Sequence, residues 1–136
     1  MNVLLDTHIW LLWVAGLKAL PKQAHDLISD RKNHIALSAA SVWEIAIKYR
    51  LGRLTLPMPP GAYVSTRLAS QHFEMLPITA MHAAEVASLP DHHQDPFDRL
   101  LVAQAQVEGM TLLTADRGLK PYTVNKIIVA GKPRRP

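Results

Sequence analysis

Residues 2–10 read NVLLDTHIW, an aliphatic run that ends on a carboxylate. Residues 3–5 have the composition of a short buried strand, and the apolar stretch 7–14 has the length of a helix. Asp6 stands at the junction, where a charge covered by helices needs a hydrogen-bonding or cationic partner. The fold must therefore bring such a partner to Asp6.

Strand-like and helix-like segments keep alternating along the rest of the chain. Strands are predicted at residues 34–37, 74–78, 110–114 and 127–129, and helices at 20–28, 62–70, 80–89 and 95–109. A further helix, capped by Ser38 or Ser41, runs to Leu51, where Gly52 ends it. This order predicts an α/β fold, a three-layer α/β/α domain with a mostly parallel central sheet.

Length and composition favour a single domain over residues 1–130, followed by a basic tail at 131–136. Because the chain has no cysteine, disulfides, thiolate nucleophiles and Cys-ligated zinc are excluded. No signal peptide and no apolar run of membrane-spanning length is visible, so we expect a soluble, cytoplasmic protein. The net charge of +4 weakly favours a nucleic-acid partner, although many small domains are basic without binding one.

Four acidic residues follow or flank the predicted strands at the same edge of the sheet. Asp6 ends the first strand, and Asp116 comes just after the strand 110–114. Asp98 lies in the first turn of the helix before that strand, and Glu44 lies early in the helix after the second strand. Ligands of open parallel α/β sheets bind at the carboxyl ends of the strands, which is where these four side chains are expected.

Four carboxylates at one edge repel one another unless a cation lies between them. Two like charges ~4 Å apart repel by about 4 kcal/mol at an effective dielectric constant near 20. Oxygen ligands suit Mg²⁺ or Mn²⁺, and two such ions can activate water for phosphodiester cleavage. The pattern therefore favours a metal-dependent phosphodiesterase.

Each acidic residue also has a purely structural interpretation. Ser41 and Glu44 match the S-x-x-E capping box, and Lys48 is spaced for a helical ion pair with Glu44. Asp98 fits a first-turn helix residue, and Asp116 fits a turn aspartate before glycine. Only the convergence of all four favours a functional site.

Other conspicuous residues are given structural roles. His92 and His93, in HHQD, are interpreted as a solvated loop because the zinc spacing H-E-x-x-H is absent. Trp10, Trp13 and Trp43 are expected to pack in the core. No P-loop, dinucleotide fingerprint or G-x-S-x-G motif occurs in the sequence.

Four segments together resemble the successive motifs of PIN-domain proteins, and most closely the VapC-type toxins of bacterial toxin–antitoxin pairs. The segments are LLDTHIW, SAASVWEIAIKYRLGRL, DPFDRLLVAQA and LLTADRGL, and the resemblance extends from Asn2 to about Val129. It implies a Mg²⁺- or Mn²⁺-dependent ribonuclease, a homodimer, and an antitoxin partner that blocks the active-site groove.

The resemblance assigns the family's acidic site to Asp6, Glu44, Asp98 and Asp116. Thr7 and Thr114 occupy family positions beside the first and last of these, so both are candidate substrate contacts. Arg99 and Arg117 each follow an acidic residue, and they are candidates for phosphate contact or for salt bridges. In DPFD the ligand is assigned to Asp98, which leaves Asp95 as a helix cap before Pro96.

Two other function classes stay open at this point. One is a PIN nuclease with a housekeeping role in RNA processing or on DNA. The other is a non-catalytic α/β module that binds a basic peptide at its acidic edge. A receiver domain is disfavoured because only Asp6, rather than a pair of acids, follows the first strand.

Overall fold

The computed structural model describes residues 1–16 and 18–129. The predicted basic tail, residues 131–136, lies outside the described residues. The elements are β1 (Asn2–Leu5), α1 (Thr7–Val14), α2 (Lys22–Ser29), β2 (His34–Ser38), α3 (Ala39–Arg50), α4 (Pro60–Gln71), β3 (Glu74–Leu76), α5 (Ala80–Glu85), η1 (Val86–Ser88), α6 (Pro96–Glu108), β4 (Thr111–Thr114), η2 (Arg117–Leu119) and β5 (Lys126–Ile128).

The sheet has five strands in the order β3-β2-β1-β4-β5, and every pairing is parallel. The predicted α/β class and parallel sheet are therefore confirmed. From β1 the chain moves outward to β2 and β3, and it then returns to place β4 and β5 on the other side of β1. The direction reverses between β1 and β4, which is the point where open α/β sheets bind their ligands.

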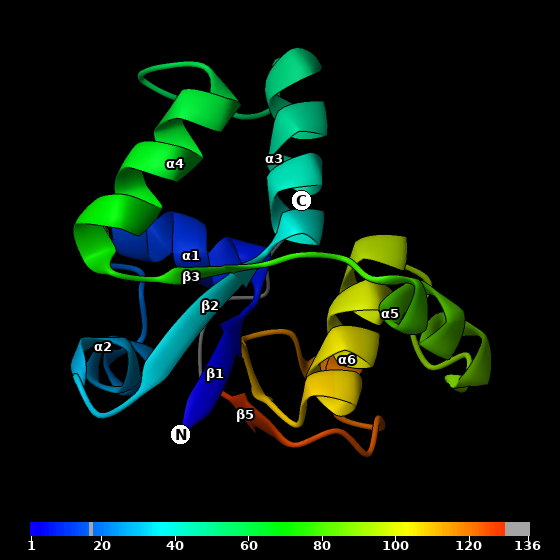
Figure 1. Cartoon of the computed structure of the whole chain (residues 1–136). Helices are drawn as coiled ribbons and strands as arrows, with labels where there is room; N and C mark the ends of the chain where they lie inside the picture. The colour runs from blue at the N-terminus through cyan, green and yellow to red at the C-terminus, as the bar shows by residue number, and fades with distance from the viewer. Residues whose placement is uncertain (17, 130–136) are drawn as a thin grey trace.

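Helices cover both faces of the sheet, as Figure 1 shows, with α1, α2 and α4 on one side and α5 and α6 on the other. Successive side chains of each strand point to opposite faces of the sheet, so each strand contributes to two hydrophobic cores. In β1, Val3 and Leu5 face the first core, whereas Leu4 faces the second. The sheet is thus the middle layer of three, as predicted.

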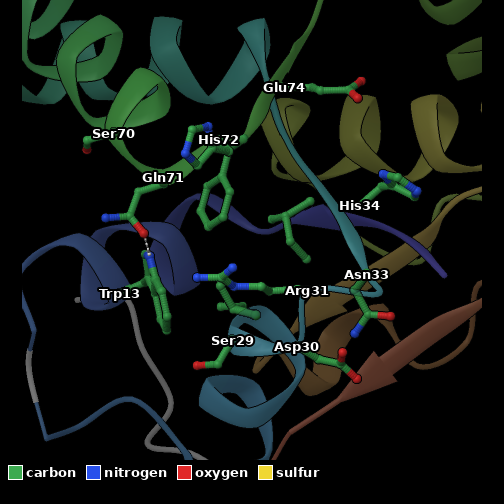
Figure 2. A pocket seen from close by; sticks show the side chains of 13 residues that line it. Trp13, Ser29, Asp30, Arg31, Asn33, His34, Ser70, Gln71, His72 and Glu74 are labelled. Atoms are coloured by element: carbon green, nitrogen blue, oxygen red, sulfur yellow. Dashed lines mark hydrogen bonds between the residues drawn. The ribbon is translucent and has the colours of Figure 1, made fainter.

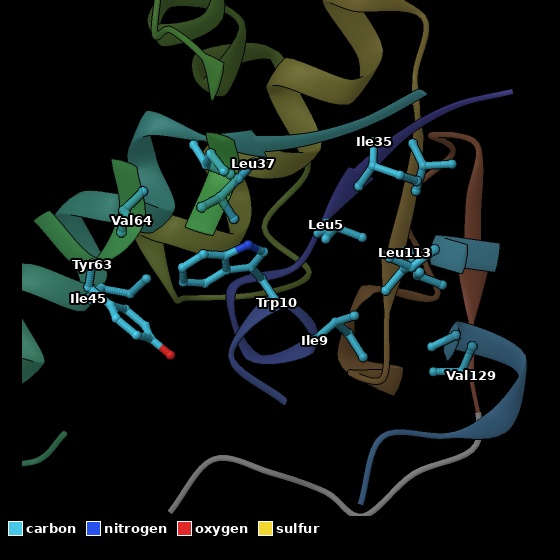
Figure 3. Close-up of a cluster of buried hydrophobic side chains, with 14 residues drawn as sticks. Leu5, Ile9, Trp10, Ile35, Leu37, Ile45, Tyr63, Val64, Leu113 and Val129 are labelled. Atoms are coloured by element: carbon cyan, nitrogen blue, oxygen red, sulfur yellow. The ribbon is translucent and has the colours of Figure 1, made fainter. Parts of the chain in front are cut away.

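Trp10 is the largest side chain of the first core and is completely buried. Figure 3 shows its indole between Leu5 and Ile9 on one side and Leu37, Val64 and Tyr63 on the other. The ring meets Tyr63 edge-on, with ring centroids 6.1 Å apart. Trp10 lies one turn after Asp6, which caps α1, so this packing fixes the helix that follows the first acidic residue.

Capping residues set the ends of the helices much as expected. Ser38, rather than Ser41, caps α3, because its hydroxyl accepts the backbone N–H of Ala40 at 2.9 Å. The helix predicted at 80–89 is shorter and continues as the 3-10 turn η1. None of the described helices has the length and apolar character needed to cross a membrane.

Candidate active site

A threonine links two of the predicted acidic residues across the ends of β1 and β4. The Thr114 hydroxyl donates to Asp6 Oδ2 at 2.6 Å, and its oxygen accepts the backbone N–H of Asp116 at 3.0 Å. The other oxygen of Asp6 caps α1 by accepting the backbone N–H of His8 at 3.0 Å. The buried Asp6 carboxylate is therefore held by a side chain of β4 and by the first turn of α1.

Glu44 reaches the same region from α3. The Thr7 hydroxyl donates to Ser41 Oγ at 2.7 Å, which ties the start of α1 to α3 one turn before Glu44. Glu44 Oε2 accepts from Lys48 Nζ at 2.8 Å, as the i,i+4 spacing predicts. Glu44 Oε1 is buried and has no hydrogen-bond partner within the described part of the chain.

The capping-box interpretation of Ser41 and Glu44 is wrong. The N-cap is Ser38, so Glu44 lies too far into the helix to return a hydrogen bond to the cap. A buried carboxylate oxygen without a partner is costly. Its presence favours a role for Glu44 other than helix capping.

Asp98, Asp116 and His93 form a close group. Their ligand atoms all lie within 4.8 Å of one another. His93 Nε2 is 3.0 Å from Asp116 Oδ2 and 3.4 Å from Asp98 Oδ2. Asp6 and Glu44 are not members of this close group.

The expectation that HHQD is a solvated loop is wrong for His93. Its side chain is only 20% exposed and lies between two of the acidic residues. Its neighbour His92 is exposed and packs edge-on against Tyr122, with centroids 5.0 Å apart. The sequence signal that was available is the position of His93 two residues before the helix cap Asp95.

Asp95 has the predicted role of helix cap. Its Oδ1 accepts the backbone N–H groups of Phe97 and Asp98 at 2.8 and 3.3 Å, and Pro96 begins α6. The carboxylate of Asp98 is almost fully buried and lies near His93. The two aspartates of DPFD thus have different surroundings.

The two candidate arginines also differ. Arg99 donates through its guanidinium to the carbonyls of Val86 and Pro90 at 3.1 and 2.9 Å and to the hydroxyl of Tyr122 at 3.2 Å. These contacts hold the segment before α6 and engage the donors that a phosphate contact would need. Arg117 is exposed beside Asp116.

Trp43 does not pack in the core, contrary to expectation, and 59% of its surface is exposed. The inner face of α3 is occupied by Ser41, Glu44 and Ile45, so the intervening Trp43 points outward. Its ring meets Phe97 edge-on at 5.2 Å.

The arrangement as a whole concentrates negative charge at the switch point of the sheet. Asp6 follows β1, Asp98 lies in the first turn of α6 and Asp116 lies in the turn after β4, while α3, which carries Glu44, is tied to the start of α1 by the Thr7–Ser41 hydrogen bond. Such an edge can hold a divalent cation through oxygen ligands, with water completing its coordination.

A separate pocket of about 600 Å³ lies at the opposite ends of the strands. Figure 2 shows its lining, which includes Trp13, His34 and His72, with the Trp13 indole donating to Gln71 at 3.1 Å. His34 begins β2, so the pocket is at the amino end of the sheet. No predicted site residue lines it.

Comparisons with known proteins show what the chain is similar to. A family model for the PIN domain matches residues 3–124. The chain is 31% identical to ribonuclease VapC22 of Mycobacterium tuberculosis (strain ATCC 25618 / H37Rv) over 122 residues, which are 89% of this chain and 92% of that protein. A shorter match, 45% identical over 58 residues, to ribonuclease VapC16 of the same organism covers 43% of this chain and 41% of that protein.

A crystal structure of VapBC2 from Rickettsia felis, bound to a DNA fragment from the promoter, shares the fold. The TM-score is 0.70 at 17% sequence identity, over 95% of this chain and 99% of that chain. At this identity the likeness concerns the fold alone.

Proposed function

Since the chain belongs to the PIN-domain family, and within it to the VapC-type ribonucleases, we propose that it is the toxin of a toxin–antitoxin pair and cuts RNA by metal-dependent hydrolysis. The observation that carries the proposal is the Thr114 hydroxyl, which joins Asp6 to Asp116 at the switch point of the sheet. The proposed setting is the cytoplasm, where the RNA is found.

The residues present fit a hard divalent cation. The four acidic residues offer only oxygen ligands, which Mg²⁺ and Mn²⁺ prefer. Glu44 Oε1 is buried without a hydrogen-bond partner among the described residues, as expected for an oxygen reserved for an ion. We propose Asp6, Glu44, Asp98 and Asp116 as the metal-holding residues.

A bound divalent ion would supply an activated water and stabilise charge on the cleaved phosphodiester. The chain's own residues orient the carboxylates for this. Thr114 and the N–H of His8 fix the two oxygens of Asp6, and Lys48 fixes one oxygen of Glu44. Water attack with departure of the 3′ oxygen would leave a 5′-phosphate and a 3′-hydroxyl.

The four candidate substrate contacts differ in whether their polar groups are already hydrogen-bonded within the protein. The hydroxyls of Thr7 and Thr114 are buried and engaged with Ser41 and Asp6, so we propose that they position the site rather than touch RNA. Arg99 is engaged with loop carbonyls. The exposed Arg117 keeps the proposed role of phosphate contact.

Removing the metal should abolish cleavage. Purified protein is incubated with mixed RNA and Mg²⁺ or Mn²⁺, and then with EDTA. Because the proposed site acts through an ion held by carboxylates, we expect cleavage to stop in EDTA and to be absent in Asp6→Asn, which keeps the shape of the side chain but not its charge. Cleavage that persists in either case contradicts the metal assignment.

The proposed antitoxin should compete with the metal ion. We propose that a segment of the antitoxin lies in the acidic groove and offers a basic side chain to Asp6, Glu44 and Asp98, since a positive head there would replace the charge of the ion. The solved relative from Rickettsia felis is a VapBC assembly, which supports a partner of this kind. Calorimetric titration of antitoxin peptide should show weaker affinity in saturating Mn²⁺, and equal affinity would refute the idea.

We also propose a homodimer. The apolar side chains of Trp43 and Ile47 on α3 and of Leu51 at its C-cap are spaced four residues apart and exposed. Exposed apolar surface of this kind is typical of protein interfaces, and it is the surface we assign to the dimer.

A further inference from the structure

His93 is held at both nitrogens of its ring. Nδ1 accepts the backbone N–H of Asp95 at 3.1 Å, and Nε2 lies 3.0 Å from Asp116 Oδ2 and 3.4 Å from Asp98 Oδ2. The ring thus connects the cap of α6 to two of the acidic residues. Nothing in the sequence motifs assigned a role to this histidine.

The partners of the ring determine where its proton lies. A backbone N–H can only donate, so Nδ1 must present its lone pair to Asp95. The proton of the neutral ring is therefore on Nε2, and it points toward carboxylates that accept hydrogen bonds when ionised. Both sides of the ring require the same tautomer.

This tautomer argues against His93 as a metal ligand, although the close group of His93, Asp98 and Asp116 resembles a metal site. A ligating Nε2 needs a free lone pair, and the other nitrogen of a metal-bound histidine donates its N–H to an acceptor. Here the other nitrogen faces a donor, the N–H of Asp95. Ligation would bring two N–H groups against each other.

We propose that His93 is a positioning residue whose Nε2–H draws Asp98 and Asp116 together and that stays outside the ligand shell of the ion. The presence of an ion in the site depends on the proposed function, but the role of His93 as a hydrogen-bond donor in the metal-free protein does not. With imidazole excluded, the site keeps only oxygen ligands. It should then favour Mg²⁺ or Mn²⁺ over Zn²⁺, which binds imidazole well.

Gly118 leaves the space that this arrangement needs. A Cβ atom at Gly118 would lie 3.0 Å from Asp116 Oδ1 and 3.1 Å from His93 Cδ2. A side chain there would press on the ring and on one of its partners. The backbone N–H of Gly118 also donates to Asp116 Oδ1 at 2.8 Å, so the far oxygen of that carboxylate is fixed as well.

Nitrogen NMR of histidine-labelled protein tests the tautomer directly. At about pH 8, where a free histidine is neutral, long-range ¹H–¹⁵N spectra distinguish protonated from bare ring nitrogens, and the His93→Gln spectrum assigns the signal. We expect a protonated Nε2 and a bare Nδ1, before and after saturation with Mg²⁺. A protonated Nδ1, or an Nε2 that loses its proton when the ion is added, would overturn the proposal.

Metal affinity provides the second readout, with Mn²⁺ as the probe in calorimetry. His93→Gln keeps an N–H near the position of Nε2 but has no imidazole nitrogen, whereas His93→Ala loses both. Loss of a group that orients ligands weakens metal binding by about 10- to 100-fold. We therefore expect that loss in His93→Ala and substantial rescue in His93→Gln.

The matched control is His92→Ala, which changes the exposed neighbour and should leave Mn²⁺ affinity unchanged. Thermal melts of each variant establish that it is folded. Equal large losses of Mn²⁺ affinity in both His93 variants would indicate that His93 is a metal ligand. No loss of affinity in either variant would show that His93 does not position the site. Either result overturns the proposal. If the parent itself binds no Mn²⁺, the metal-dependent function fails, while the metal-free NMR result still decides the donor role.

Discussion

Asp98→Ala should abolish RNA cleavage and remove most of the stabilisation that Mn²⁺ gives the parent protein. Asp98 is buried, and one of its carboxylate oxygens lies within 4.8 Å of a carboxylate oxygen of Asp116. Removing the Asp98 carboxylate therefore relieves like-charge repulsion in the metal-free protein. Without metal we therefore expect stability to hold or rise. An ion present at 100 times its dissociation constant stabilises the parent by about 2.7 kcal/mol, and this gain should shrink sharply in the variant.

Asp95→Ala is the matched control, three residues away and also at the start of α6. Its carboxylate caps the helix through two backbone N–H groups, and losing a cap costs about 1 kcal/mol. The Tm should fall by roughly 3–5 °C, while the Mn²⁺ response and most activity remain. Thermal melts with and without Mn²⁺, run beside a cleavage assay, separate the two. If Asp95→Ala loses activity and Asp98→Ala keeps it, the third ligand has been assigned to the wrong residue.

Trp10→Ala should produce the largest loss of stability of any single substitution considered for this chain. The side chain is fully buried in the first core, and truncating a buried tryptophan costs about 3–5 kcal/mol. That is a large fraction of the roughly 5–15 kcal/mol by which a domain is stable. Urea denaturation should show the midpoint moving to much lower denaturant at a similar slope.

Trp43→Ala is the control for this effect, because it removes the same side chain from an exposed position. In the single chain 59% of Trp43 is in solvent, so the expected change, measured below the protein concentration at which the proposed dimer forms, is within about 1 kcal/mol of the parent. Equal destabilisation of the two variants under these conditions would contradict the exposed position of Trp43.

Local signals predicted most of the fold from sequence. In α6, Asp95 and Pro96 begin the helix and Gly109 ends it with the positive φ of 67° that favours glycine. These signals act within a few residues of one another, so no tertiary contact is needed to locate them. The buried strands β1, β2 and β4 were found for the same reason, since each is a short aliphatic run bounded by polar residues.

The candidate site was predictable only as a set of carboxylates at one edge of the sheet. Ser38, the last residue of β2, caps α3, whereas Ser41 lies inside the helix and accepts a hydrogen bond from Thr7 of another helix. The role of His93 depends on Asp116, 23 residues away in the chain. Contacts of this range are set by packing, and sequence periodicity carries no information about them.

The position of Trp43 was missed for a related reason. A tryptophan on a helix is buried when that face of the helix meets another element, and the contact partner is a property of the whole fold. The inner face of α3 is set by Ile45, which packs in the first core, and by Ser41, which meets Thr7. Helical geometry then turns Trp43 outward.

The central place of β1 in the sheet has a consequence for how the protein is made. Asp6, which directly follows β1, accepts a hydrogen bond from the hydroxyl of Thr114, 108 residues later in the chain. A growing chain therefore has no assembled site until β4 and Asp116 have emerged from the ribosome. For a protein that we propose cuts RNA, the unfinished chain would then have no complete site with which to cut the RNA around it.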